Sequence, residues 1–281
     1  MITTIYKPKP ITSLLRNQYK NLILKPCLRF SRYRDSYPKF WTMPYDIICR
    51  EILLNGYYEK ELLIGMAAIV KNKSGTVLDI GANIGNHSVF FSKTFKQVIS
   101  FEPVPRNCWI FKANLHLNEI DNVTLVEKAL SDKNQLQFLS HDDPCNTNNG
   151  LSQLSQGIGS RVEVVRGDDV LRTMDYAAPI ALIKVDVEGL EHEVIKGLEE
   201  TIGEYRPTIC WEGFTSEGVL ATKTTLEDMG YRNFYHLTTS RFENRYMNKL
   251  ANSFGKSVYL LPLDHCKSFD GMNVASSNPI E

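Results

Sequence analysis

The sequence predicts an α/β fold built on a doubly wound, mostly parallel sheet. Two observations support this fold class. Short apolar runs alternate with helical segments from residue 76 onward, and a glycine-rich turn joins the first apolar run to the helix after it. Repeated strand–helix units place parallel strands in one sheet with helices packed on it. With 281 residues, of which 43% are hydrophobic, the chain can bury a core without disulfide or metal staples.

The expected elements follow in order along the chain. Residues 45–71 have helical apolar spacing, interrupted by the stop signal Asn55-Gly56. The alternating strands and helices that come next are expected at residues 76–80, 86–95, 97–101, 105–118, 123–130, 181–187, 190–203 and 207–212.

Three further segments complete the expected organisation. Residues 136–139 and 161–165 predict a β excursion around a polar stretch at 141–160, and residues 231–237 and 257–261 predict a closing hairpin. The tail after Pro262 is expected to be weakly ordered. The predicted boundaries are a basic arm at 1–40, a domain at 41–263 whose helices lead in at 41–75, and a tail at 264–281.

The charge is unevenly distributed. The net charge is 0, yet residues 1–40 carry nine Lys/Arg against Asp35 alone, which leaves the remaining body acidic. A basic amphipathic segment can contact an anionic membrane surface, resembles an import peptide in composition, or is simply a solvated arm. No nucleic acid partner is expected, because the body is acidic.

Several classes of protein are excluded by composition. The longest apolar run, Leu62–Val70, is far too short to cross a bilayer. The six cysteines are scattered without metal-binding spacing, and no secretory signal is visible. We therefore expect reduced thiols in a cytoplasmic protein, with peripheral membrane contact of the arm as one alternative.

The glycine-rich turn is the most informative motif. It follows the strand Thr76–Ile80 and contains Gly81, Ala82, Asn83 and Gly85. Glycine allows a ligand to approach the backbone closely, and the helix beyond offers free N–H groups to an anionic group. Asp79, just before the turn, can accept a hydrogen bond from an ammonium. A nicotinamide dehydrogenase would have more glycines here, so a pyrophosphate is disfavoured.

A second acidic residue ends the next strand. Glu102 lies in Phe101-Glu102-Pro103, at a distance beyond the glycine turn where a carboxylate can accept both hydroxyls of a nucleoside ribose.

The fourth expected parallel strand carries unusual charges. Lys184, Asp186 and Glu188 share one side of a strand that should be apolar on both faces. We expect Lys184 to pair with a carboxylate such as Asp186, because burying an unpaired charge is costly. Such a pair can be purely structural or part of a reaction centre. His87, after the turn, and Glu212, after the fifth strand, can also reach this edge.

These residues together resemble the FkbM family of S-adenosylmethionine-dependent methyltransferases. The motifs that carry the resemblance are Asn55-Gly-Tyr-Tyr-Glu59, Asp79-Ile-Gly-Ala-Asn-Ile-Gly, Phe101-Glu102-Pro103, Ala129-Leu-Ser-Asp132 and Ile183-Lys-Val-Asp-Val-Glu-Gly-Leu-Glu191. The resemblance covers residues 45–263. It implies a Rossmann-like class I methyltransferase fold, with a seven-stranded sheet and an antiparallel closing strand.

The resemblance also implies roles for individual residues. Asp79 and the turn residues Gly81, Ala82, Asn83 and Gly85 would hold the methionine part of S-adenosylmethionine. Glu102 would hold its ribose, and Ala129 to Asp132 would lie by the adenine. Asp186 and Glu188 would face the methyl group. The implied reaction is methyl transfer to a hydroxyl oxygen of a small-molecule or glycan acceptor, such as one in polysaccharide biosynthesis.

An alcohol is a weak nucleophile at neutral pH, so a base within hydrogen-bond reach helps. The candidates are Asp186, Glu188 and His87, in that order. Alternatively, Asp186 and Glu188 could bind a divalent cation that lowers the pKa of the acceptor. We favour the metal-free route, since no third ligand is identifiable. The rival interpretations are a nicotinamide oxidoreductase and a non-catalytic binding module on the same fold.

Overall fold

The structure is a computed structural model of the chain. It describes residues 38–42, 47–139, 154–155, 160–176, 178–187, 189–213, 215–239, 248–253, 256–263 and 271–280. The expectations for the basic arm at residues 1–37, and for most of the polar stretch at 141–160, lie outside these ranges. Residues Lys39–Glu281 form one compact unit, to which the following description applies.

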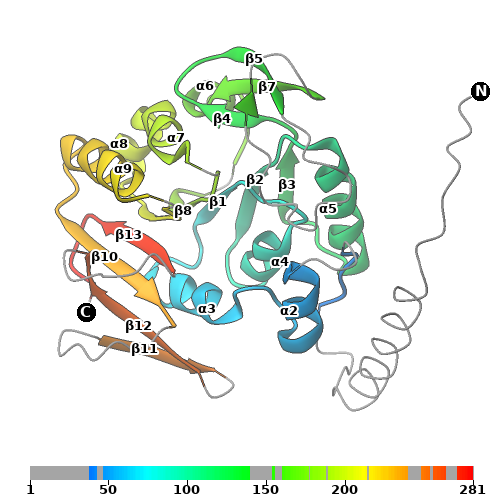
Figure 1. Cartoon of the computed structure of the whole chain (residues 1–281), viewed down its shortest axis with the longest axis horizontal. Coiled ribbons are helices and arrows are strands. Elements are labelled where there is room, and N and C mark those ends of the chain that lie inside the picture. Colours follow the sequence, from blue (N-terminus) through cyan, green and yellow to red (C-terminus); the bar gives the residue numbers. More distant parts are fainter. Residues whose placement is uncertain are drawn as a thin grey trace, which may run out of the picture. The chain divides into compact units, whose positions relative to one another are not determined.

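A nine-stranded sheet forms the centre of this unit, in the order β11-β12-β10-β13-β9-β8-β1-β2-β3 (Figure 1). The five strands from β9 to β3 are parallel, whereas β13 is antiparallel to both β9 and β10. The seven strands from β10 to β3 therefore confirm the predicted Rossmann-like fold with its antiparallel strand, and β12 and β11 extend it. The bounds are β1 Thr76–Ile80, β2 Gln97–Phe101, β3 Val123–Val126, β8 Ile180–Val185, β9 Thr208–Trp211, β10 Asn233–Thr238, β11 Asn248–Ser253, β12 Lys256–Pro262 and β13 Met272–Ser276.

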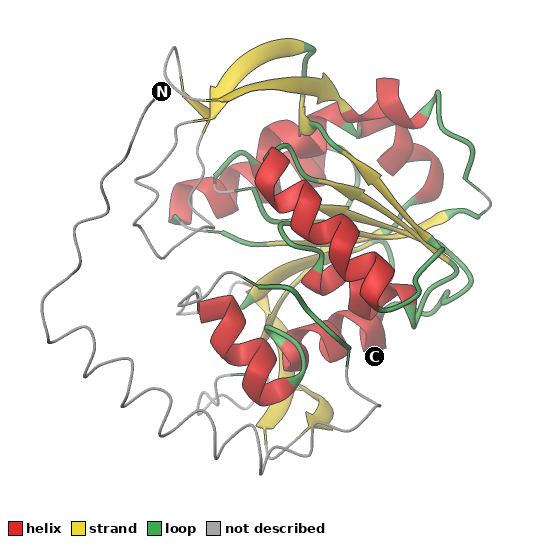
Figure 2. Cartoon of the chain, turned by 90° about the vertical axis from the view of Figure 1, so that its right-hand side faces the viewer, coloured by secondary structure: helices red, strands yellow, loops and turns green. Residues whose placement is uncertain are grey.

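Helices pack on both faces of the sheet (Figures 1 and 2). The described helices are α2 Ile47–Asn55, α3 Lys60–Ile69, α4 Asn86–Ser92, α5 Pro105–Leu117, α6 Gly167–Leu171, α7 Glu191–Gly197, α8 Glu199–Tyr205 and α9 Ser216–Asp228. Side chains alternate between the two faces of a strand. Val77 and Leu182 therefore lie in one core with α3 and α4, whereas Leu78 and Ile183 lie in the other core with α7 and α8. Both faces of the central strands are thus buried, as a parallel sheet requires.

The C-terminal residues differ from the prediction. Met272–Ser276, expected to belong to a weakly ordered tail, form β13 between β9 and β10, and Val274 and Ala275 are fully buried. The expectation was wrong because this segment, with three apolar residues among five, is too short to predict a strand by itself. Its strand conformation depends on hydrogen-bonding partners on both sides, which come from distant parts of the chain. The predicted pairing of β10 with β12 is confirmed.

The predicted β excursion is confirmed as a second sheet. Its order is β4-β7-β5-β6, with bounds Ala129–Ser131, Ser160–Arg166, Gln135–Leu139 and Leu154–Ser155. The strand expected at 123–130 is consequently two strands, because β3 pairs with β2 while β4 pairs with β7. The helix expected at 190–203 is likewise divided into α7 and α8 at Leu198.

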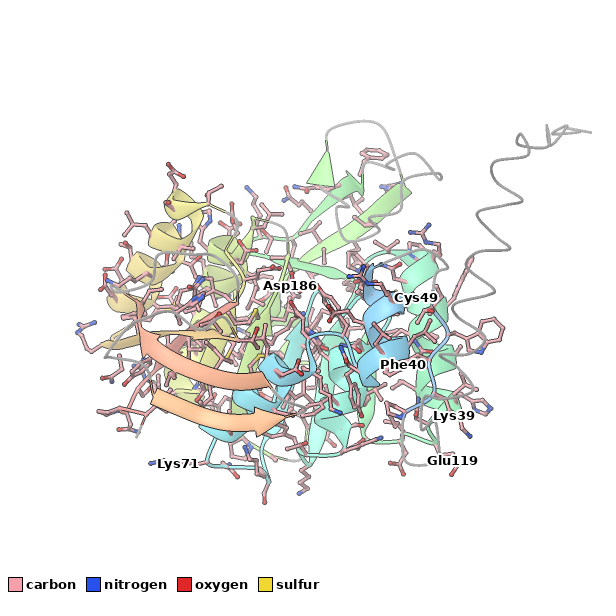
Figure 3. The ribbon with its side chains drawn as sticks, turned by 60° about the horizontal axis from the view of Figure 1, so that its bottom comes forward. Lys39, Phe40, Cys49, Lys71, Glu119 and Asp186 are labelled. Atoms are coloured by element: carbon pink, nitrogen blue, oxygen red, sulfur yellow. The ribbon has the colours of Figure 1, made fainter. Side chains whose placement is uncertain are left out.

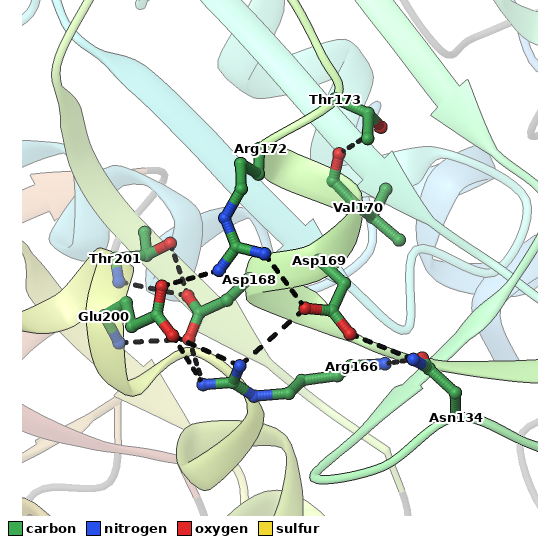
Figure 4. Close-up of polar contacts among 9 residues, drawn as sticks. All are labelled: Asn134, Arg166, Asp168, Asp169, Val170, Arg172, Thr173, Glu200 and Thr201. Carbon is green, nitrogen blue, oxygen red and sulfur yellow. Dashed lines mark hydrogen bonds and ion pairs between the residues drawn. The ribbon is translucent and has the colours of Figure 1, made fainter.

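A charged cluster connects this second sheet to α8, and we call it the Arg166 network (Figure 4). Its ionic members are Arg166, Asp168, Asp169, Arg172 and Glu200. The buried Asp168 carboxylate accepts hydrogen bonds from the backbone amides of Glu200 and Thr201, each at 3.0 Å. These amides belong to the first turn of α8 and have no partner within the helix. The network therefore fastens β7 and α6 to the start of α8.

Within the described ranges, no helix is both long enough and apolar enough to cross a membrane.

Candidate active site

The glycine turn bends sharply between β1 and α4. Gly81 and Gly85 have φ values of 77° and 85°, and Asn83 between them also has a positive φ of 50°. A Cβ on Gly81 would lie 1.8 Å from the carbonyl oxygen of Asp186, and one on Gly85 would lie 2.9 Å from the Phe111 ring. Both glycines are therefore required by the protein's own packing, which brings the turn against the end of β8.

Glu102 lies beside this turn at the end of β2. Its carboxylate is buried and accepts hydrogen bonds from the backbone amides of Asn83 and Val104, each at 2.9 Å. The Asn107 side chain donates to the same carboxylate at 3.3 Å. Burial raises the pKa of Glu102 to about 7, although these hydrogen bonds oppose the shift. The carboxylate is thus fixed next to the turn, where its role towards a ribose remains a prediction.

Lys184 is a buried cation at the end of β8. Its ammonium lies 3.2 Å from Asp79 and 3.3 Å from Asp186, and it donates a hydrogen bond to the Gly81 carbonyl at 3.1 Å. The ammonium has three donors. Burial alone would lower its pKa, but the Asp186 and Asp79 carboxylates raise it overall. The predicted pairing of Lys184 with Asp186 is confirmed. Lys184 of β8 also contacts β1 through Asp79 and the glycine turn through the Gly81 carbonyl.

Asp79 lies deeper than the sequence suggested. Parallel register places it beside Lys184 on β8 and Ser100 on β2, and its side chain is fully buried. It accepts a short hydrogen bond from Ser88 on α4, and the Ser88 hydroxyl contacts that of Ser100 at 2.8 Å. The ammonium that Asp79 meets in this structure is therefore that of Lys184.

Asp186 is the most accessible ionised group of the site, with a side chain 28% exposed (labelled in Figure 3). It shares a side-chain hydrogen bond with Glu212, the residue after β9. Although burial opposes it, the Lys184 cation lowers the pKa of Asp186. Burial and the Asp186 charge together raise the pKa of Glu212 to about 9. The two carboxyl groups therefore have opposite protonation states at neutral pH.

His87 joins the same edge from α4. Its ring is buried, lies 3.4 Å from the Glu59 carboxylate through Nε2, and stacks on Tyr58 with an interplanar angle of 8°. Asn86 holds this segment by accepting a hydrogen bond from the Tyr58 amide and donating one to the Tyr58 carbonyl, both at 3.0 Å. The segment between α2 and α3 is thereby clamped to the start of α4.

Tyr58 and Glu59 were not among the predicted site residues. The pKa of the Tyr58 phenol is raised by burial and then by Glu59, Glu212 and Asp186, so the phenol faces these acids. The motif Asn55-Gly-Tyr-Tyr-Glu59 was visible in the sequence, but no local pattern shows that it returns to the sheet edge. Below, the edge cluster means Tyr58, Glu59, His87, Lys184, Asp186 and Glu212.

The remaining predicted residues have different surroundings. Ala82 is buried, and its amide donates to the Phe101 carbonyl at 3.0 Å. Ala129 begins β4 in the second sheet and is half-buried, whereas Asp132, just beyond β4, is exposed. Glu188 lies outside the described residues. Among the residues with described positions, no group of three or more His, Cys, Asp or Glu is arranged to hold a metal ion.

The chain is similar to known methyltransferases. A family model described as the methyltransferase FkbM domain matches residues 79–233, which is more than half of the chain. Methyltransferase 1 of Beauveria bassiana is 27% identical over 177 residues, which cover 55% of this chain and 71% of that protein. Methyltransferase sdnD of Sordaria araneosa is 27% identical over 188 residues, covering 55% of this chain and 73% of that protein.

Solved structures show the same kind of likeness. A methyltransferase FkbM from Methylobacillus flagellatus matches 86% of this chain and 60% of its own, with 15% identity and a TM-score of 0.44. A SAM-dependent O-methyltransferase from Thermotoga maritima matches 83% of this chain and 72% of its own, with 12% identity and a TM-score of 0.44.

Proposed function

The chain belongs to the FkbM methyltransferase family and uses S-adenosylmethionine, and we propose that it methylates a hydroxyl oxygen of a sugar or glycan. Asp186 carries the proposal. It is an ionised, partly exposed carboxylate at the carboxyl end of β8, and its backbone packs against the glycine turn. A carboxylate in this state accepts a hydrogen bond from a hydroxyl and can take its proton.

The turn and Glu102 fit the donor. The backbone from Gly81 to Gly85 would hold the methionine part, and the Glu102 carboxylate retains acceptor capacity for a ribose hydroxyl beyond its hydrogen bonds from Asn83, Val104 and Asn107. Asp79 has no exposed surface. We therefore assign it to holding Lys184 rather than to touching the donor.

The chemistry divides between the donor and the protein. When bound, S-adenosylmethionine would supply a methyl group on a positively charged sulfur, and that sulfur would keep the electron pair of the C–S bond. Asp186 takes the proton of the acceptor hydroxyl, and the hydroxyl oxygen forms the new C–O bond. Lys184 keeps the Asp186 carboxylate ionised, and Tyr58 and His87 border the place of the acceptor. The protein contributes mainly alignment and proton transfer.

A panel of neutral sugars, polysaccharides and nucleotide sugars, incubated with labelled S-adenosylmethionine, tests the proposal. We expect label in an alkali-stable methyl ether on at least one acceptor. Asp186→Asn should retain donor binding but lose turnover by about 100-fold or more, the scale of a general base. Glu188→Gln, in the same motif, is the second variant to compare.

Asp175→Asn is the matched control, because Asp175 is an exposed aspartate ahead of the same strand. Its turnover should equal that of the wild type. Label recovered only in methyl esters or methylamines would contradict the hydroxyl acceptor. Normal turnover of both Asp186→Asn and Glu188→Gln would contradict the role of these carboxylates as the base.

A further inference from the structure

Glu212 forms a carboxyl pair with Asp186 across the ends of two parallel strands. Val185 of β8 pairs with Trp211 of β9, so the residues that follow them are neighbours. The Glu212 amide donates to the Val185 carbonyl at 3.0 Å, which fixes the backbone of the pair. The two side chains share a hydrogen bond. Since an ionised carboxylate only accepts, one member of the pair must carry a proton.

The surroundings decide which member carries it. Lys184 lies 3.3 Å from Asp186 and favours the charged form of that carboxylate. Burial disfavours a charge on Glu212 most strongly, followed by Asp186 after β8 and Glu59 before α3, and the opposing effect of Lys184 is smaller than each of these. The proton therefore resides on Glu212, and the negative charge on Asp186.

We propose that Glu212 is a positioning residue for Asp186: its protonated carboxyl donates to the Asp186 carboxylate and orients it towards the acceptor. Lys184 and Glu212 then hold the carboxylate from two strands, β8 itself and β9. The inference rests on the proposed role of Asp186 as the base, and it adds that the base functions only while Glu212 keeps its proton.

The proposal has a consequence at alkaline pH. When Glu212 loses its proton, the pair carries two adjacent negative charges and Asp186 loses a donor. Among the described residues, the titratable or charged groups that face the pair are Lys184 on β8, His87 on α4, Glu191 on α7, and Tyr58 and Glu59 before α3. Because Glu59 and Glu191 are also acidic, Lys184 alone among these groups is a cation that can offset the second charge at alkaline pH.

Two substitutions of Glu212 distinguish its role as a hydrogen-bond donor from its ability to ionise. Glu212→Gln keeps an N–H donor for Asp186 but cannot ionise, whereas Glu212→Ala removes the donor. Carboxyl carbons of the full-length protein, labelled with ¹³C in Asp and Glu, are followed by NMR over pH. Comparison with Glu212→Gln and Asp186→Asn identifies the two signals, and Glu217→Ala, an exposed glutamate on α9, is the control.

We expect one glutamate signal to titrate far above the usual range in the wild type and to be missing in Glu212→Gln. The Asp186 midpoint should stay low in Glu212→Gln but rise by about one pH unit in Glu212→Ala, the size of one lost hydrogen bond. A Glu212 midpoint near that of an exposed glutamate would overturn the proposal. So would equal Asp186 midpoints in the two variants. If Glu212→Ala does not fold, the Glu212 midpoint of the wild type, identified by the signal missing in Glu212→Gln, decides whether the proposal holds.

These titrations need no methyl acceptor, so they can fail while the proposed function holds, and the reverse is also possible. With an acceptor in hand, turnover of the wild type should fall at alkaline pH as Glu212 loses its proton. Glu212→Gln should lack this alkaline fall, whereas a merely structural residue would leave the shape of the pH profile unchanged.

Discussion

The edge cluster and the Arg166 network both gather charges, but they do so under different conditions. In the Arg166 network two arginines meet three carboxylates, and most of these side chains are substantially exposed. In the edge cluster Lys184, 1% exposed, meets Asp186 and also contacts Asp79 behind the cluster, while Glu59 and Glu212 add further acid. The excess of buried acid forces Glu212 to keep a proton. A single buried cation among several acids indicates chemistry, whereas a largely exposed network with nearly as many cations as acids indicates structural support.

Removing the cation should break the edge cluster most severely. Lys184→Met would leave Asp79 and Asp186 without their counter-ion, and losing one partner of a buried pair costs about 3–5 kcal/mol in the free energy of unfolding. Urea denaturation measures this loss. Lys112→Met, at an exposed ion pair with Glu127, should leave the unfolding midpoint unchanged. Equal stability of both variants would mean that Asp79 and Asp186 do not need the cation.

Donor affinity should depend on Glu102. Above the Glu102 pKa of about 7, Glu102→Ala removes a charged acceptor for the ribose, and a hydrogen bond to a charged group contributes about 1.5–3 kcal/mol. The affinity for S-adenosylmethionine, measured by calorimetry, should fall by about 10- to 100-fold. Glu127→Ala, at an exposed glutamate beyond β3, is the control. Unchanged affinity in a folded Glu102→Ala protein would remove Glu102 from the donor site.

The buried proton predicts a specific dependence of stability on pH. The folded-state pKa of Glu212, about 9, exceeds the ordinary glutamate value of 4.5. The stability it contributes is complete below about pH 4.5 and is lost as the pH rises towards about 9, because only the unfolded state releases the proton in this window. Glu212→Gln does not ionise.

The stability of Glu212→Gln relative to the wild type should therefore increase with pH across this window. The slope cannot exceed about 1.4 kcal/mol per pH unit, because a single proton is released, and the partial exposure of Glu212 narrows the pH window. Asp186 and Glu102 titrate in both proteins, so their effects on stability cancel in the comparison. Thermal unfolding of the two proteins at pH 5, 7 and 9 is the measurement. A difference that stays constant over this series is incompatible with a raised Glu212 pKa.

The Arg166 network should respond more weakly. Asp168→Ala removes the acceptor for two amides in the first turn of α8, and a lost helix cap costs about 0.5–2 kcal/mol. Arg172→Ala, at an exposed position in the same network, should not change the unfolding midpoint. Neither variant should alter donor affinity. A larger loss from Arg172→Ala than from Asp168→Ala would contradict the assignment of the buried cap as the stabilising contact.

The sequence alone determined most of the fold and half of the site. Strand–turn–helix spacing identified β1, β2, β8 and β9 in order, and the charged residues of β8 revealed an unusual central strand. Lys184 and Asp186 were identified because charges in a buried parallel strand are unusual, and Asp79 because it directly precedes the glycine turn. The position of Glu102 beside the turn followed from the rule that ligands meet the carboxyl ends of parallel strands.

Only the tertiary structure decided the rest. Met272–Ser276 became a central strand because β9 and β10 leave a place for it, which its own sequence does not indicate. Tyr58 and Glu59 reached the edge cluster because Asn86 clamps their loop to α4 across 28 positions of sequence. The proton on Glu212 arises from the register of β8 against β9, which sets two acids side by side. Local patterns report what a residue prefers, whereas charge balance and shared protons depend on which distant residues the fold brings within reach.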